Sequence, residues 1–117
     1  MFNFSKAQRD CVLKIHDFVV EHIIEHYTIE ELAERFEISP TSLKKCFKEM
    51  YGVPIYTYCR TYRLQIAEKM LREGQLSVAE IAAKIGYINP NKFTSAFCSE
   101  YKMTPTEYKK NVQMDRK

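Results

Sequence analysis

The hydrophobic residues of this chain recur at three- and four-residue spacing along almost its whole length. In the first segment Cys11, Ile15, Phe18 and Val19 follow this spacing, which predicts an amphipathic helix over about residues 6–26. No segment alternates hydrophobic and polar residues in the way that a half-buried strand does. The pattern therefore predicts an all-α fold with seven helices.

Helix start signals divide the rest of the chain. Thr28 with Glu31, and Ser77 with Glu80, form the capping box, in which hydroxyl and carboxylate each accept a hydrogen bond from the other residue's amide. Proline at or near the first helical position marks four other starts: Pro40, Pro54, Pro90 and Pro105. The longest predicted helix covers residues 54–73 and, at 1.5 Å per residue, is about 30 Å long.

The chain also contains an internal repeat. At an offset of 49 residues the matched pairs are Thr28 and Ser77, Ile29 and Val78, Glu31 and Glu80, Leu32 and Ile81, Ala33 and Ala82, and Arg35 and Lys84. At an offset of 50 they are Pro40 and Pro90, Leu43 and Phe93, Phe47 and Phe97, Tyr51 and Tyr101, Tyr58 and Tyr108, and Arg60 and Lys110. Caps, core positions and the turn all recur, so two copies of one structural unit are expected. We expect one domain over 1–117, with a first subdomain over about 6–52, a linker helix over 54–73 and a second subdomain over about 75–112.

Each copy has the plan of a helix-turn-helix unit: a capped short helix, a tight turn and a second helix of about 12 residues. Ala33 and Ala82 are small where the two helices would cross, and Gly86 suits a turn residue with positive φ. The first copy has Glu37 at the corresponding position. A left-handed Glu37 would cost roughly 1 kcal/mol, so a different first turn is the alternative.

Charge is distributed unevenly along the chain. The net charge is only +3, but residues 1–39 carry 4 basic and 8 acidic side chains, whereas residues 40–72 carry 7 basic and 2 acidic ones. The outer face of the second helix in each copy offers basic or short hydrogen-bonding side chains that suit base edges and phosphates in a DNA major groove. An exposed polar face that is merely solvated is the alternative, and it is disfavoured because the same arrangement occurs twice.

The sequence resembles the DNA-binding domain of the AraC/XylS family of transcription regulators. The resemblance rests mainly on residues 77–82, 86–87, 91–97 and 104–108, and it covers about residues 8–110. It implies seven helices, with two helix-turn-helix subdomains joined by one long helix and both recognition helices in successive major grooves on one face of double-stranded DNA. The predicted length of the linker helix is comparable to one turn of DNA, about 34 Å.

The resemblance also implies which side chains meet DNA. The base-reading candidates are Thr41, Lys44, Lys45, Asn91, Lys92 and Ser95. The phosphate candidates are Ser39, Lys48, Asn89, Thr94, Arg60 and Arg63. For the two arginines, pairing with nearby acids is an equal alternative.

The family often has Arg where this chain has Ser95, and Gly where it has Lys102. The first departure suggests weaker or shifted reading by the second copy, and the second puts the geometry of the last turn in question.

Other functions are less well supported by the sequence. The four cysteines are far apart and are expected to be reduced, so a zinc site or redox pair is a minor alternative. His22 and His26 stand four residues apart but lack the H-E-x-x-H pattern. We expect no enzyme activity, no cofactor, no metal, no membrane segment and a cytoplasmic location.

The rival hypothesis is a helical interaction module that contacts the transcription machinery, for example RNA polymerase. Family regulators usually carry a sensor or dimerisation domain, so this chain is expected to be an output domain, with a stand-alone regulator as the alternative.

Overall fold

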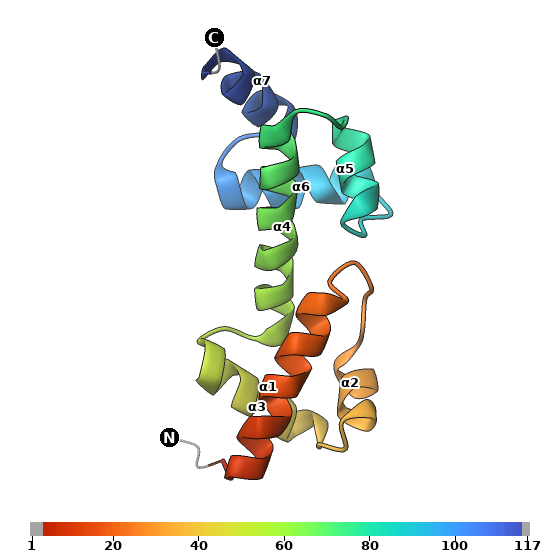
Figure 1. Ribbon diagram of the computed structural model, residues 1–117, viewed down its shortest axis with the longest axis vertical. Helices are drawn as coiled ribbons and strands as arrows, with labels where there is room; N and C mark the ends of the chain where they lie inside the picture. The colour runs from red at the N-terminus through yellow and green to blue at the C-terminus, as the bar shows by residue number, and fades with distance from the viewer. Residues whose placement is uncertain (1–3, 116–117) are drawn as a thin grey trace. The chain divides into compact units, whose positions relative to one another are not determined.

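The computed structural model describes residues 4–115, and this part of the chain is helical, with seven helices and no strand (Figure 1). The helices are α1 (Lys6–Glu21), α2 (Ile29–Arg35), α3 (Pro40–Tyr51), α4 (Ile55–Glu73), α5 (Val78–Lys84), α6 (Pro90–Tyr101) and α7 (Pro105–Asp115). The predicted all-α fold with seven helices is therefore confirmed.

Two boundaries differ from the prediction. The first helix was expected to reach about residue 26, but it ends at Glu21, where His22 leaves helical geometry with φ −110° and ψ 37°. The Phe18 ring packs against the His22 ring at 4.4 Å and the Tyr27 ring at 5.0 Å. This packing turns the chain back toward α2, which the periodicity of the sequence could not reveal. At the other end α7 continues to Asp115, beyond the predicted end near residue 112; residues 116 and 117 lie outside the described part.

The chain divides between Arg60 and Thr61 into two compact units, named unit 1 and unit 2 here, and α4 contributes residues to both. In unit 1, α3 packs against α1 and α2 around a core of buried side chains. These are Val12, Ile15, Val19, Leu32, Ala33, Leu43, Cys46, Phe47 and Ile55. In unit 2, α6 packs against α5 and α7. The buried core residues are Leu64, Ala67, Leu71, Ile81, Ala82, Ile85, Phe93 and Phe97.

The repeat extends further than the sequence comparison indicated. Val12, Ile15 and Val19 of α1 occupy the core of unit 1 as Leu64, Ala67 and Leu71 of α4 occupy the core of unit 2, at an offset of 52 residues. These side chains differ in size and the two segments have few identical residues, so the match was missed. Each unit thus has a first helical segment, a helix-turn-helix pair and a following helical segment, which is the start of α4 in unit 1 and α7 in unit 2.

Matching aromatic clusters close the two cores. In unit 1 the Phe47 ring lies 4.6 Å from Tyr51 and 5.5 Å from Tyr58. In unit 2 the Phe97 ring lies 4.5 Å from Tyr101 and 5.6 Å from Tyr108. Burial raises the pKa of Tyr51, Tyr101 and Tyr108, so these phenols remain neutral at physiological pH. These four tyrosines are half-buried and pack against the two cores, at the positions that their helical spacing predicted.

The polar ends of these clusters differ between the units. The Nε2 atom of His16 lies 2.7 Å from the hydroxyl of Tyr58. At the equivalent place in unit 2, the hydroxyl of Tyr108 donates a 2.8 Å hydrogen bond to Glu68, which also pairs with Arg72. His16 and Glu68 are related by the same 52-residue offset, so a histidine and a carboxylate serve the same structural purpose.

Further findings bear on the cysteines, the histidines and a possible membrane segment. Within the described part of the chain, no disulfide joins the four cysteines, and no group of three or more potential metal ligands is found. His22 and His26 do not lie on one helix, because α1 ends before both. No described helix has the length and apolar character needed to span a bilayer.

Candidate nucleic-acid interface

Local sequence signals position α2 and α3 as a helix-turn-helix pair. The Thr28 hydroxyl accepts a 3.1 Å hydrogen bond from the Glu31 amide, and the Glu31 carboxylate accepts one from the Thr28 amide at 3.2 Å. Ser39 caps α3 by accepting a 3.1 Å hydrogen bond from the Ser42 amide. Because Pro40 follows as the first helical residue, the start of α3 is well defined.

The same signals position α5 and α6 in unit 2. Ser77 and Glu80 form the reciprocal capping box at 3.1 and 3.0 Å. Hydrogen bonding with Ser77, mainly the bond that the Ser77 amide donates to the carboxylate, holds the pKa of the Glu80 carboxyl below its ordinary value. Asn89 caps α6 through a 2.9 Å hydrogen bond that its side-chain oxygen accepts from the Asn91 amide. The hydroxyls of Thr28 and Ser77 therefore both have a structural role, since each accepts a hydrogen bond that caps a helix.

The two turns have the same geometry. Glu37 has φ 55° and Gly86 has φ 90°, so both are left-handed. The next amide donates to the carbonyl of the small crossing residue: Ile38 to Ala33 at 3.0 Å, and Tyr87 to Ala82 at 2.9 Å. The alternative of a different first turn is therefore wrong. The turn is held by these hydrogen bonds and by core packing on both sides, which outweigh the local cost of a left-handed glutamate.

Lys102 adopts the conformation that its position demands. It ends α6 at φ 63°, as Gly52 ends α3 at φ 82°, and both amides donate 2.8 Å hydrogen bonds to the carbonyl four residues earlier. The departure from the family's glycine therefore leaves the last turn unchanged.

The candidate contact residues of α3 form an exposed surface on unit 1. Thr41, Lys44, Lys45 and Lys48 are exposed, as is the capping residue Ser39. Three ammonium groups within two helical turns create a locally positive surface that suits a polyanion. An exposed acid, Glu49, also stands on α3 one turn after Lys45, which the sequence argument overlooked.

On α6 the candidate surface is less basic. Asn91, Lys92 and Ser95 are exposed, and so is the capping residue Asn89. Thr94 is only half-buried, so part of its side chain remains accessible. Unit 2 therefore presents one lysine and several uncharged hydrogen-bonding groups where unit 1 presents three lysines.

The two arginines of α4 differ in accessibility. Arg60 is half-buried, whereas only 9% of Arg63 is exposed. A guanidinium must reach solvent to meet a phosphate, so the low exposure of Arg63 disfavours the predicted phosphate contact and favours the alternative, a role within the protein.

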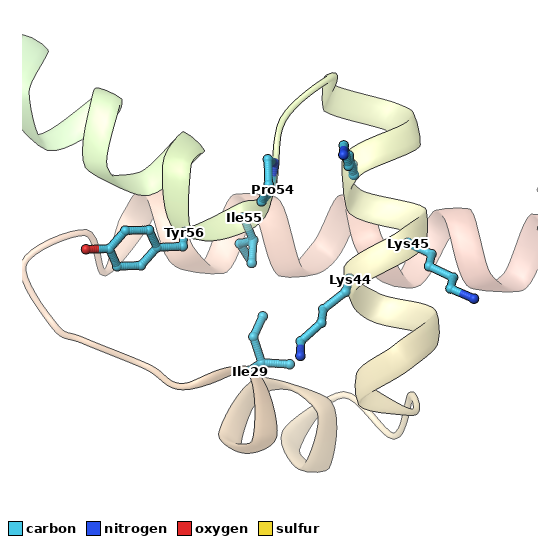
Figure 2. Close-up of a pocket in the computed structure, with 7 residues that line it drawn as sticks. Ile29, Lys44, Lys45, Pro54, Ile55 and Tyr56 are labelled. Carbon is cyan, nitrogen blue, oxygen red and sulfur yellow. The ribbon is translucent and has the colours of Figure 1, made fainter. Parts of the chain in front are cut away.

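A shallow apolar pocket beside α3 was not predicted. It has a volume of about 330 Å³ and lies within unit 1. Its lining consists of Ile29, Lys44, Lys45, Lys48, Pro54, Ile55 and Tyr56. Figure 2 shows Ile29 and Ile55 facing each other across the pocket, with Lys44 reaching in from α3 and Lys45 pointing away. Tyr56, which is 74% exposed, forms its outer wall.

Comparison with known proteins identifies the family of this fold. The sequence profile of a helix-turn-helix domain family matches residues 32–111, more than half of the chain. Among solved structures, the DNA-binding domain of AdpA, crystallised with a target DNA, is similar with a TM-score of 0.84 at 23% identity, covering 90% of this chain and 95% of that one. The C-terminal domain of the response regulator yesN from Fusobacterium nucleatum is similar with a TM-score of 0.69 at 28% identity, covering 80% and 97%.

Curated relatives are transcription regulators of greater length. The activator RclR of Escherichia coli is 33% identical over 87 residues, which are 74% of this chain and 31% of RclR. The probable regulator LumQ of Photobacterium leiognathi is 24% identical over 108 residues, 92% of this chain and 44% of LumQ. The chain thus spans less than half the length of these relatives.

The fold and the two capped helix pairs define the class: this is a helix-turn-helix DNA-binding domain of the kind that bacterial transcription regulators carry. The chain belongs to the AraC/XylS family, whose C-terminal DNA-binding domain it matches.

Proposed function

We propose that α3 and α6 each enter a major groove of double-stranded DNA and that the two grooves are successive. The observation that carries this proposal is the repeated unit, in which the second helix twice exposes hydrogen-bonding side chains beside the same capped turn. A single polar helix face would be unremarkable, but its recurrence on two equivalent helices calls for a common ligand. A duplex supplies one, since it presents the same groove at every turn.

The exposed side chains suggest what each unit reads. In unit 1, Lys44 and Lys45 can donate to the O6 and N7 acceptors of guanine, and Thr41 can bond to several bases. In unit 2, Asn91 suits the N6 and N7 atoms of adenine, and Lys92 suits guanine. Ser95 stands where family members often carry Arg, which removes a bidentate guanine contact worth about 1–3 kcal/mol of discrimination. We therefore expect unit 1 to contribute more of the sequence specificity.

Phosphate contacts would hold each helix in register. Lys48 can neutralise a phosphate beside α3, and Arg60 and Thr94 retain enough exposure to contribute. Because the side chains of Ser39 and Asn89 already accept amide hydrogen bonds, their contribution would come from backbone amides at the helix start. These contacts position the protein without reading sequence.

The spacing of the two recognition elements on DNA is expected to be near one helical turn. Docking in successive major grooves places the two contacts one DNA turn apart, about 34 Å. Selection of bound duplexes from a random library should yield two short blocks about 10 base pairs apart. Inserting about five base pairs between them should abolish the joint contact, because it moves one groove to the opposite face. Undiminished affinity would contradict docking in two grooves.

The role of α3 can be tested through the salt dependence of binding. Lys48→Ala should lower the slope of log affinity against log salt concentration by about 0.9, the amount expected for one lost phosphate contact. Lys14→Ala is a matched control, because Lys14 is an exposed lysine of α1 outside the proposed interface. Equal slopes for the two variants would place Lys48 outside the interface.

A second candidate function is a contact with another protein of the transcription machinery. Its basis is the acidic first third of the chain, in which Glu30, Glu34 and Glu37 are exposed on or beside α2. RNA polymerase is one such partner, and the sensor or dimerisation domain of a longer regulator is another. A chain that acts only through such contacts would bind duplex DNA weakly and without the steep salt dependence of phosphate neutralisation.

A further inference from the structure

Ile88 is the most exposed large hydrophobic side chain in the described part of the chain, at 99% of its surface. It lies in the turn before α6, one residue before the cap Asn89 and three before the exposed Asn91. A fully exposed isoleucine contributes nothing to the core, and it leaves apolar surface in water that burial would favour by roughly 25 cal/mol per Å².

The fold does not require this residue. In unit 1 the chain passes directly from Ile38 to the cap Ser39, whereas in unit 2 Ile88 stands between the equivalent residues Tyr87 and Asn89. Both turns nevertheless make the same hydrogen bonds to Ala33 and Ala82. Ile88 is therefore an insertion that unit 1 does without, and no packing role explains an apolar side chain there.

We infer that Ile88 reads a thymine through the methyl group of the base, next to the bases met by Asn91 and Lys92. The inference rests on the proposed entry of α6 into a major groove. Thymine is the one base that presents an apolar group there, its C5 methyl. An isoleucine can neither donate nor accept a hydrogen bond, so of the groups in the groove it selects this one. The contact gives unit 2 a means of discrimination that offsets the absence of Arg at Ser95.

The experiment starts from a duplex selected by the wild-type chain. Each thymine in and beside the second block is replaced in turn by deoxyuridine, which removes the methyl group and leaves base pairing intact. Affinities are measured by fluorescence anisotropy at one fixed salt concentration. We expect one replacement to weaken binding about fourfold, which corresponds to about 0.8 kcal/mol for one buried methyl group.

Variants assign this loss to the side chain. Ile88→Ser should bind the thymine and deoxyuridine duplexes equally, whereas Ile88→Val, which keeps a branched apolar surface, should still prefer thymine. Ile24→Ser is the matched control: Ile24 is 54% exposed, lies in unit 1 outside the proposed interface, and should leave the wild-type preference unchanged. Because Ile88 makes no core contact, both Ile88 variants should have the melting temperature of the wild type.

Several outcomes would overturn the inference. A selected second block without thymine would do so. Equal affinity of the wild type for the thymine and deoxyuridine duplexes at every position would do so too. The same preference in Ile88→Ser as in the wild type would show that another group reads the methyl. A loss of affinity in Ile88→Ser with an unchanged thymine preference would indicate a sugar contact instead. Failure of the proposed function is distinguishable, because then the wild-type chain would select no second block at all.

Discussion

Replacing Glu37 by glycine should stabilise the protein. Glu37 is held at φ 55° after the end of α2, in a conformation that glycine adopts freely and other residues adopt at a cost. Its equivalent in unit 2 is Gly86 at φ 90°, with matching hydrogen bonds on either side. The exposed carboxylate also stands near the negative end of the α2 dipole, where an acid is unfavourable.

The expected magnitude combines three contributions. Release of the left-handed strain is worth about 1–2 kcal/mol. Removal of the charge from the helix end adds about 0.3 kcal/mol. The greater freedom of glycine in the unfolded chain offsets this gain by about 0.5–1 kcal/mol. The net gain for Glu37→Gly is therefore about 0.3–1.8 kcal/mol, which corresponds to a rise in melting temperature of roughly 1–9 °C.

Urea denaturation followed by circular dichroism measures this difference. Glu37→Ala is the control, because it removes the carboxylate but keeps a β-carbon in the strained conformation. After the greater freedom of glycine in the unfolded chain is subtracted, it should remain less stable than Glu37→Gly by roughly 0.7 kcal/mol. The reciprocal change Gly86→Ala should destabilise the protein by a similar amount. If Glu37→Gly and Glu37→Ala were equally stable, the left-handed turn would not carry the strain assigned to it.

Three other predictions concern the core and the caps. Phe97→Ala should cost about 3–5 kcal/mol, because the ring is fully buried and leaves a cavity; a midpoint of urea denaturation near that of the wild type would show that the site collapses or is not core. Tyr108→Phe should cost about 1–3 kcal/mol by removing the hydrogen bond to the Glu68 carboxylate, and an unchanged midpoint would contradict that bond. The depressed pKa of Glu80, caused by its hydrogen bonds from Ser77, implies stability that is present above the unfolded pKa and lost as the pH falls through the folded one. Glu80→Gln should therefore lose less stability than the wild type between about pH 7 and pH 3, and an equal loss would refute this role.

Much of the fold was predictable because its signals are local. Helix-start signals act within one helical turn, so the sequence is sufficient to locate the helix starts that they mark. These signals are the capping boxes at Thr28 and Ser77 and the prolines Pro40 and Pro90. The buried positions of Phe47 and similar residues follow from helical spacing.

The candidate site was predictable in outline. The exposed face of α3 follows from its core face, so Lys44 and Lys45 lie where the spacing placed them. Ile88 was overlooked, because a single isoleucine in a turn looks like a core residue until its exposure is known. The burial of Arg63 was missed for the opposite reason, because a charged residue is usually exposed and only packing reveals a buried one.

The sequence by itself determined the number of helices, most of their starts, their buried faces and the twofold repeat of the helix-turn-helix plan. Only the tertiary structure decided where α1 ends, that Glu37 adopts the left-handed turn, and that α1 and the second half of α4 are equivalent. The physical reason is the range of the forces. Caps and periodicity depend on neighbours within a few residues. These three features depend instead on packing between segments that are distant in the sequence. The contact of His16 with Tyr58, 42 residues away, is an example of such packing.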